Sequence, residues 1–188
     1  INFDLEEETS SLEEVVVSAT RSDENVSSVK MSTEKLQIER IKSMPALFGE
    51  VDIVKSLQLL PGVSNAGEGT SGMFVRGGSS DQNLILLDEA TVYNSSHLLG
   101  FFSVFNPDAV KNVEIYKGGI PAKYGGRISS ILDIQMREGN NQEFEASGGI
   151  GSISSRLTAE IPVVKDQSSL LLSGRRTYAD VFLGFAQD

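Results

Sequence analysis

The sequence of 188 residues has no cysteine and no tryptophan, and it has a single histidine. The absence of cysteine excludes disulfides, thiolate metal sites and cysteine nucleophiles. A lone histidine among scattered acids does not make a ligand set, so we expect no metal site and no cofactor. No apolar run approaches the roughly 20 residues that a membrane-spanning helix needs.

Negative charge is concentrated at the N-terminus, where the first 14 residues carry six acids and no basic residue. Removing these six from the 26 acids leaves 20 against 16 Lys and Arg, so the remainder is nearly balanced. This pattern predicts an acidic, solvated leader over residues 1–21. Nucleic acid is an unexpected partner, because no basic stripe exists. Without an initiator Met or a signal sequence, the chain is interpreted as a piece of a longer protein.

Three consecutive valines, Val15, Val16 and Val17, lie at the end of this leader. Because β-branched residues favour extended backbone, the segment predicts a short strand. It is either an ordinary first strand of the domain or a strand that another protein's sheet edge accepts by β-augmentation.

Residues 22–139 alternate between helical and extended patterns. Residues 26–31 predict a strand. A helix is expected to begin at Ser32 and to end before Pro45, with Leu36, Ile38 and Ile41 on its apolar side. Residues 49–60 predict a clearer helix, whose apolar stripe consists of Ile53, Val54, Leu57 and Leu60.

Residues 65–72 form a glycine-rich loop. It opens onto a strand and lacks a Gly-Lys-Ser/Thr sequence, which argues against nucleotide binding. Residues 84–87 are continuously apolar, as in an interior strand, and Asp88-Glu89 then predicts a turn. The aromatic side chains of the following loop, residues 92–106, either pack beneath it or contact a ligand. Asp88, Glu89 and His97 are the one cluster that suggests acid–base chemistry, and a turn with a loop histidine explains it more simply.

Residues 106–138 have a distinctive order of elements. Asn106-Pro107 predicts a short helical turn, residues 113–116 a strand, and residues 127–137 another strand. Two glycine pairs, 118–119 and 125–126, lie between the strands.

From residue 144 onward the pattern has a strict period of two. Strands are expected at 144–150, at 153–163 and from Ser168 to Tyr178, with a tight polar turn at 165–167. On the second strand, Leu157, Ala159 and Ile161 share one face, and Arg156 and Glu160 share the other. Such strands belong either to a soluble meander with one solvent-exposed face or to an outer-membrane barrel whose apolar face contacts lipid. The period of two is the same in both kinds of sheet and does not distinguish them.

Four segments resemble, in order and spacing, the plug region of TonB-dependent outer-membrane receptors. They are EVVVSA at 14–19, FVRGG at 74–78, LILLDE at 84–89 and the stretch 106–138, although that family often has Asp-Gly where this chain has Asp88-Glu89. The resemblance implies an α+β, plug-type globule over 22–139 with a small mixed β-sheet and short helices. Antiparallel strands over 140–188 would begin a truncated barrel.

The resemblance also implies a function without catalysis: gating the uptake of a scarce or bulky substrate across the outer membrane. The partners would be periplasmic TonB, the missing barrel, membrane lipid and an unknown substrate. TonB would contact Glu14, Val15, Val16, Val17, Ser18 and Ala19. Ionic contacts to the barrel would involve Arg76, Glu114 and Arg127, with a pair between Arg76 and Glu114 as the alternative. Substrate-facing loops would carry Asn65, Glu68, Ser71, Tyr93, His97 and Phe101. A soluble ligand- or protein-binding module is the alternative function, and a hydrolase is a second one.

Overall fold

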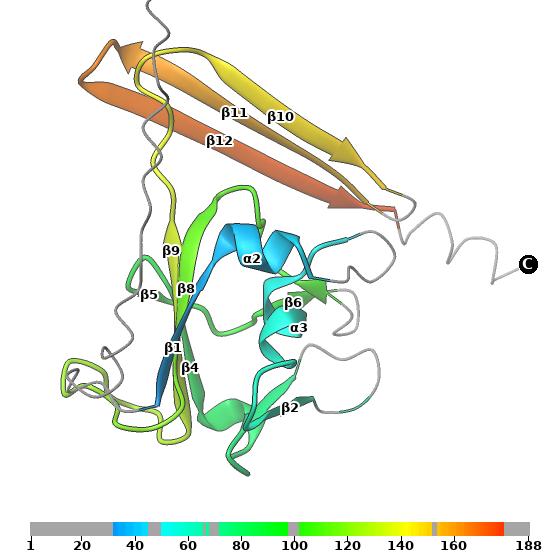
Figure 1. Cartoon of the computed structure of the whole chain (residues 1–188), viewed down its shortest axis with the longest axis vertical. Coiled ribbons are helices and arrows are strands. Elements are labelled where there is room, and N and C mark those ends of the chain that lie inside the picture. The colour runs from blue at the N-terminus through cyan, green and yellow to red at the C-terminus, as the bar shows by residue number, and fades with distance from the viewer. Residues whose placement is uncertain are drawn as a thin grey trace, which may run out of the picture.

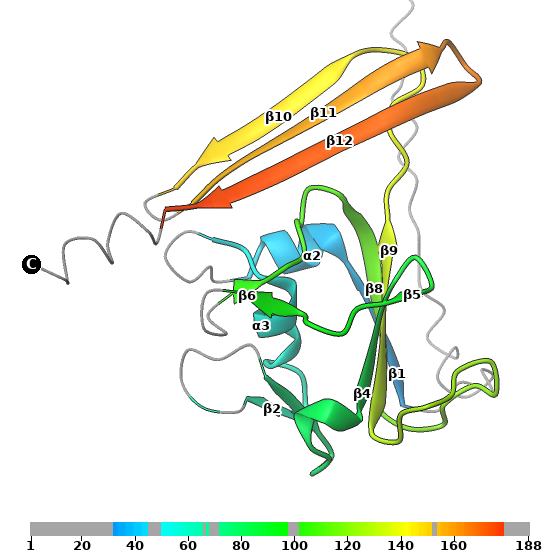
Figure 2. The ribbon, with the colours of Figure 1, turned by 180° about the vertical axis from the view of Figure 1, so that it is seen from behind.

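The computed structural model describes residues 32–44, 50–65, 67, 72–97, 102–151 and 154–178. It has two parts (Figure 1): a globule of strands and short helices, and a three-stranded sheet that lies across one end of the globule. The view from behind shows the same arrangement (Figure 2). The strand expected at 26–31 lies outside the described residues, and the domain boundaries at 21 and 139 stay predictions.

The globule is built on a five-stranded mixed sheet. Its strands, in spatial order, are β1 (Thr33–Gln37), β8 (Val110–Tyr116), β9 (Ser130–Met136), β4 (Asn83–Leu87) and β5 (Ala90–Thr91). Strands β4 and β9 are parallel, and the other pairs are antiparallel. The predicted interior strand at 84–87 is confirmed, because β4 lies between β9 and β5. The predicted strands around 113–116 and 127–137 correspond to β8 and β9.

Two short helices, α2 (Ile38–Lys42) and α3 (Ile53–Leu57), cover one face of this sheet. The expected helix start at Ser32 is wrong, because residues 33–37 form β1 and pair with β8. In this register Leu36 lies opposite Val113 and is buried, so pairing and burial override the local preference for a helix. The second helix is shorter than expected: α3 begins after Asp52, whose carboxylate accepts a hydrogen bond from the Lys55 amide.

The core lies between the helices and the sheet. Its members alternate along the central strands and recur at helical spacing, as the apolar patterns predict. The largest fully buried aliphatic side chains of this cluster are Ile41, Ile53, Leu57, Ile115, Leu132 and Ile134. The opposite face of the sheet carries a smaller cluster around Leu86, Tyr116 and Ile131.

Shorter elements complete the globule: β2 (Val63–Asn65), β3 (Met73–Val75), the 3-10 helix η1 (Ser80–Gln82), β6 (Ser96–His97) and β7 (Phe102–Ser103). The turn at Asp88-Glu89 is confirmed as a two-residue hairpin with positive φ at both residues. In the aromatic loop, Phe102 and Phe105 are buried, whereas Tyr93 is exposed. Asn106-Pro107 begins a hydrogen-bonded turn instead of the expected turn of helix.

Three antiparallel strands follow the globule: β10 (Glu145–Ile150), β11 (Ser154–Val164) and β12 (Ser168–Thr177). Their order and the turn at 165–167 are as predicted, and the register keeps the predicted faces together as far as Ile161. Between Pro162 and Val164 the register shifts by one residue. In the part of the chain that the structure describes, no helix is long and apolar enough to span a membrane.

Candidate functional site: a polar interface between the globule and the three-stranded sheet

The three-stranded sheet turns its polar face toward the globule. Ser154, Arg156, Thr158 and Glu160 alternate along β11 on this face, and each of the four is buried or half-buried. Three of them, Ser154, Arg156 and Glu160, contact side chains from before β10. The interface is therefore made of hydrogen bonds and ion pairs instead of apolar packing.

Two arginines face each other on this surface. Arg156 of β11 lies directly opposite Arg175 of β12 in the antiparallel register. Like charges at such positions repel and destabilise a sheet. Gly149 lies opposite Arg156 on β10, where a Cβ atom would stand 3.3 Å from the guanidinium carbon, so the glycine leaves space for this side chain.

Glu50 is the main counter-charge of the two arginines. Its carboxylate lies 3.1 Å from Nη1 of Arg175 and 4.0 Å from Nη1 of Arg156, and it accepts a hydrogen bond from the Ser154 hydroxyl. The side chains of Glu50 and Arg175 are only 5% and 8% exposed. A buried charge without a partner would cost several kcal/mol, so these groups depend on each other.

Asp52 brings the groups around Arg175 together. One of its carboxylate oxygens accepts from the Lys55 amide at the start of α3, and the other accepts from the Ser103 amide in β7. This bridge fastens the segment after Glu50 to β7. The carbonyl groups of Ser103 and Phe105 then accept hydrogen bonds from the Arg175 guanidinium.

The turn that begins at Asn106 supplies the second counter-charge. The Asn106 carbonyl and side-chain oxygens accept from the amides of Ala109 and Asp108, while its amide donates to Ser173 of β12. Asp108 then lies 2.7 Å from Nε of Arg156 and 2.8 Å from Nζ of Lys42. Burial opposes ionisation of Asp108 most strongly, but Lys42 and Arg156 together hold the pKa of this carboxyl below its usual range.

A second group of contacts lies near the start of β10. Glu145 and Glu160 face each other on β10 and β11, which again places like charges on adjacent strands. Arg137 pairs with Glu160, whose other oxygen accepts from the Asn140 amide. The Asn140 side chain donates to Glu145 over 3.0 Å. Groups that precede β10 therefore stabilise both like-charged pairs of the sheet.

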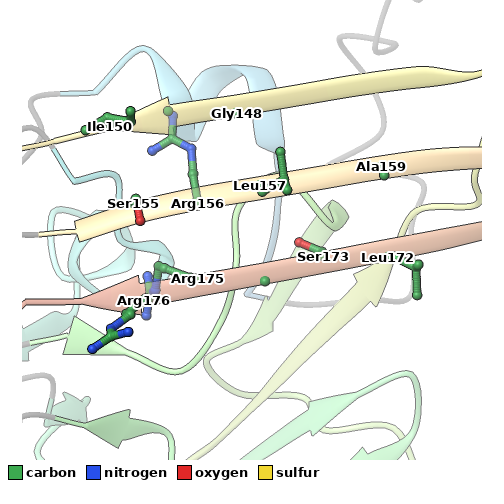
Figure 3. A pocket seen from close by; sticks show the side chains of 12 residues that line it. Gly148, Ile150, Ser155, Arg156, Leu157, Ala159, Leu172, Ser173, Arg175 and Arg176 are labelled. Carbon is green, nitrogen blue, oxygen red and sulfur yellow. The ribbon is translucent and has the colours of Figure 1, made fainter.

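The opposite face of the sheet is apolar and points away from the globule. Ile150, Leu157 and Leu172 are 91%, 64% and 53% exposed. A groove of about 920 Å³ runs along one end of the sheet and is lined mainly by residues of this face (Figure 3). Monomeric soluble proteins rarely leave such an apolar face open.

The three residues expected to contact the barrel lie in the globule. Arg76 has a positive φ and donates to the Ser32 hydroxyl over 2.7 Å. Glu114 pairs with Lys35 over 3.8 Å and accepts from the Tyr116 hydroxyl. Arg127 is exposed, and its charge contributes to the lowered pKa of Asp81, after the hydrogen bonds from Ser79 and the Asp81 amide. Their contacts with a barrel stay predictions.

The predicted loop residues are only partly within the described residues. Asn65 ends β2 and is exposed, Tyr93 is 88% exposed, and His97 lies in β6, where its backbone pairs with β7. Glu68, Ser71 and Phe101 lie outside the described residues, as does the whole predicted TonB segment from Glu14 to Ala19. Substrate and TonB contacts at these positions stay predictions.

The acidic turn has a structural role. The Asp88 carboxylate accepts a hydrogen bond from the Met136 amide over 2.9 Å, which fastens the β4–β5 turn to the end of β9. Among the described residues, no three His, Cys, Asp or Glu side chains are grouped so that they could hold a metal ion.

No single motif of the sequence marks Glu50, Asp108, Arg156 or Arg175 as an interface residue. One signal for them was available in the sequence. The turn at 165–167 joins the two strands as a hairpin and brings Arg156 near Arg175 and Arg176, and neighbouring arginines require acids from elsewhere. The register shift between Pro162 and Val164 then decides that Arg156 faces Arg175. No local pattern identifies Glu50 and Asp108 as those acids.

Comparisons with known proteins agree with this architecture. The family model of the TonB-dependent receptor plug domain matches residues 25–130. The vitamin B12 transporter BtuB of Vibrio vulnificus (strain YJ016) is 33% identical over 150 residues, which are 73% of this chain and 23% of that protein. The rhizobactin receptor of Rhizobium meliloti (strain 1021) is 25% identical over 157 residues, 78% of this chain and 20% of that receptor. The chain thus spans less than a quarter of the length of these relatives.

Solved structures show the same fold. The siderophore receptor PirA from Acinetobacter baumannii has a TM-score of 0.58 at 19% identity, over 79% of this chain and 24% of that chain. The ferric-catecholate import receptor Fiu from E. coli K12 has a TM-score of 0.56 at 20% identity, over 79% of this chain and 21% of that chain. The plug-type fold is therefore confirmed, and the chain belongs to the TonB-dependent receptor plug domain family.

Proposed function

We propose that this chain is the plug, with the first wall strands, of a TonB-dependent transporter in the outer membrane. The globule blocks the lumen of the barrel and yields during the uptake of a scarce or bulky substrate. Family membership supports a role in transport, as do the relatives, which include a vitamin B12 transporter and siderophore receptors.

The orientation of the three-stranded sheet carries the proposal. Its polar face is directed at the globule, and its apolar face is exposed. The polar face carries four charged side chains: Glu145, Arg156, Glu160 and Arg175. This is the arrangement of a barrel wall, in which lumen-facing and lipid-facing residues alternate. A soluble binding module, the alternative, would bury the apolar face against the globule, because burial of apolar surface drives folding in water.

The polar interface suits a plug that has to move. When an apolar interface opens, it exposes hydrocarbon to water at about 25 cal/mol per Å². An interface of ion pairs and hydrogen bonds exposes groups that water can solvate again, so its net stabilisation is smaller than its gross interaction energy. The globule is thus held in one orientation by specific contacts and is still able to leave it.

TonB is the proposed source of the force. It would add a strand to residues 14–19, so that main-chain hydrogen bonds carry the load along the chain. Substrate would bind on the outward side, at the loops that contain Asn65 and Tyr93. Pulling on residues 14–19 would then displace part of the globule and open a path.

The test replaces Val16 by proline in the full-length protein. Proline removes a main-chain donor and breaks strand pairing, so we expect uptake to be lost while substrate binding at the cell surface is unchanged. Both are measured with labelled substrate in cells with and without an inner-membrane proton gradient. Ser10→Pro, outside the predicted segment, is the matched control and should transport normally. Normal uptake by the Val16→Pro variant would overturn the proposed role of TonB.

A further inference from the structure

Arg156 and Arg175 are neighbours on the three-stranded sheet, and the carboxylates that pair with them belong to the globule. The two side chains rise from adjacent strands near the same end of the three-stranded sheet (Figure 3). Among the described residues, the carboxylates that pair with them are Glu50 and Asp108, both in the globule. Movement of the globule away from the sheet therefore separates two positive charges from their counter-charges.

We propose that Arg156 and Arg175 form a latent anion-binding site, which Glu50 and Asp108 occupy at rest. When the globule yields, an anionic group of the substrate takes the place of these carboxylates. The ligand class is a multivalent anion that presents carboxylate or phosphate oxygens. The inference rests on the proposed function, because it assigns the site to the opened path.

The chemistry of the pair favours this class of ligand. Guanidinium groups bind carboxylate and phosphate through two parallel hydrogen bonds. Residues directly opposite on antiparallel strands have Cβ atoms about 4.5–5.5 Å apart, so a single multivalent anion can reach both arginines. The repulsion between the two arginines adds to the driving force for anion binding, since a bound anion removes this repulsion.

Charge is also separated along the polar face. The acidic pair Glu145 and Glu160 lies toward the start of β10, four register positions from Arg156 and Arg175. Arg137 and Asn140, which hold that acidic pair, lie in the segment that joins β9 to β10 and connects directly to the sheet. The acidic pair keeps its partners when the rest of the globule moves, whereas the arginine pair does not. An anion in the path is therefore attracted to the arginine end of the sheet.

The experiment titrates inorganic pyrophosphate against the thermal unfolding of the 188-residue chain, at constant ionic strength set with chloride. The variant Glu50→Gln/Asp108→Asn removes the resident carboxylates and keeps both arginines. We expect saturating pyrophosphate to raise its unfolding midpoint by about 5 °C. The wild-type chain should shift by less than about 1 °C, because its own carboxylates occupy the site.

Two further variants identify the residues. Addition of Arg156→Gln and Arg175→Gln to the carboxylate-free variant should abolish the pyrophosphate shift. Addition of Arg176→Gln, which changes the neighbouring arginine of the opposite face, should leave the shift intact. Equal shifts in all variants, or no shift in the carboxylate-free variant, would overturn the inference. If the double variant does not fold, Asp108→Asn alone frees Arg156 and is titrated in the same way, with the same two outcomes.

The titration separates this inference from the proposed function. It needs neither TonB nor uptake, so a pyrophosphate shift in a protein whose Val16→Pro variant transports normally would support the anion site and reject the coupling to TonB. The reverse result would support transport and reject the anion site.

Discussion

At the scale of single residues, a few polar side chains decide how the globule meets the sheet. Asp52 is central among them, because its two carboxylate oxygens join α3 to β7 and thereby align Glu50 with the carbonyl of Ser103. Left-handed backbone is a second feature at this scale. Arg76, Asp88, Glu89 and Asp166 all have positive φ without being glycine, and each lies in a turn.

Glu89 has a φ of +69° at the second position of the β4–β5 turn. We predict that Glu89→Gly stabilises the chain by about 1 kcal/mol, because glycine adopts this conformation without steric strain. Urea unfolding at pH 7 measures the change. Glu89→Ala is the control: it removes the same charge, keeps the strain and should not stabilise. An equal gain in both variants would assign the effect to charge.

Asp108 makes stability depend on acid pH. The pKa of this carboxyl is lower in the folded chain than its ordinary value of 3.8, so its contribution is fully present above that value and is lost as the pH falls through the folded pKa. We predict that Asp108→Asn costs about 2 kcal/mol at pH 7, since hydrogen bonds to charged groups contribute about that much. The difference from the wild-type chain should shrink below about pH 4. Urea unfolding at pH 7 and pH 3 tests this, and a difference that stays constant would contradict it.

At the scale of elements, the hairpin of β11 and β12 is the most informative. Its register places Leu157, Leu170 and Leu172 on one face and both Arg156 and Arg175 on the other. In strand β1 the local pattern did not predict the structure, since its residues have a helix-start pattern but pair with β8. An alternating pattern determines which residues share a face of a strand. In a short segment with an ambiguous pattern, pairing with a neighbouring strand determines the structure.

The outer face of the hairpin is predicted to meet lipid. Leu157→Arg in the full-length protein should destabilise the membrane-inserted form by about 2–4 kcal/mol, as expected for arginine near the middle of the bilayer. Ser147→Arg, on the polar face of β10, is the matched control and should insert normally. Folded protein in outer-membrane vesicles is quantified by resistance to protease. Equal insertion of the two variants would argue that this face does not contact lipid.

At the scale of the whole molecule, the globule and the sheet complete each other electrostatically. Each carries charges that are compensated across the interface, so neither surface is well suited to stand alone. The contacts are concentrated in a few charged groups, and removal of one partner therefore has a large effect.

A double-mutant cycle on Glu50 and Arg175 measures this dependence. Each single change, Glu50→Ala or Arg175→Ala, should destabilise the chain by about 3 kcal/mol, because it removes the closest counter-charge of the other, buried group. The double variant should lose clearly less than the sum of the two, with an interaction energy of at least about 1 kcal/mol. Urea unfolding of the four proteins gives the cycle. Additive losses would mean that the two residues stabilise the chain independently.

The sequence by itself determined the central strands β4, β8 and β9, the acidic turn, the alternation of the last three strands and the family resemblance. These features depend on local rules: turn residues, periodicity and spacing. Tertiary structure alone decided that residues 33–37 join a sheet, that the polar face meets the globule and that Glu50 pairs with Arg175. Those two residues are 125 positions apart. Local preference says nothing about such partners, because burial and charge compensation are settled only when distant segments pack together.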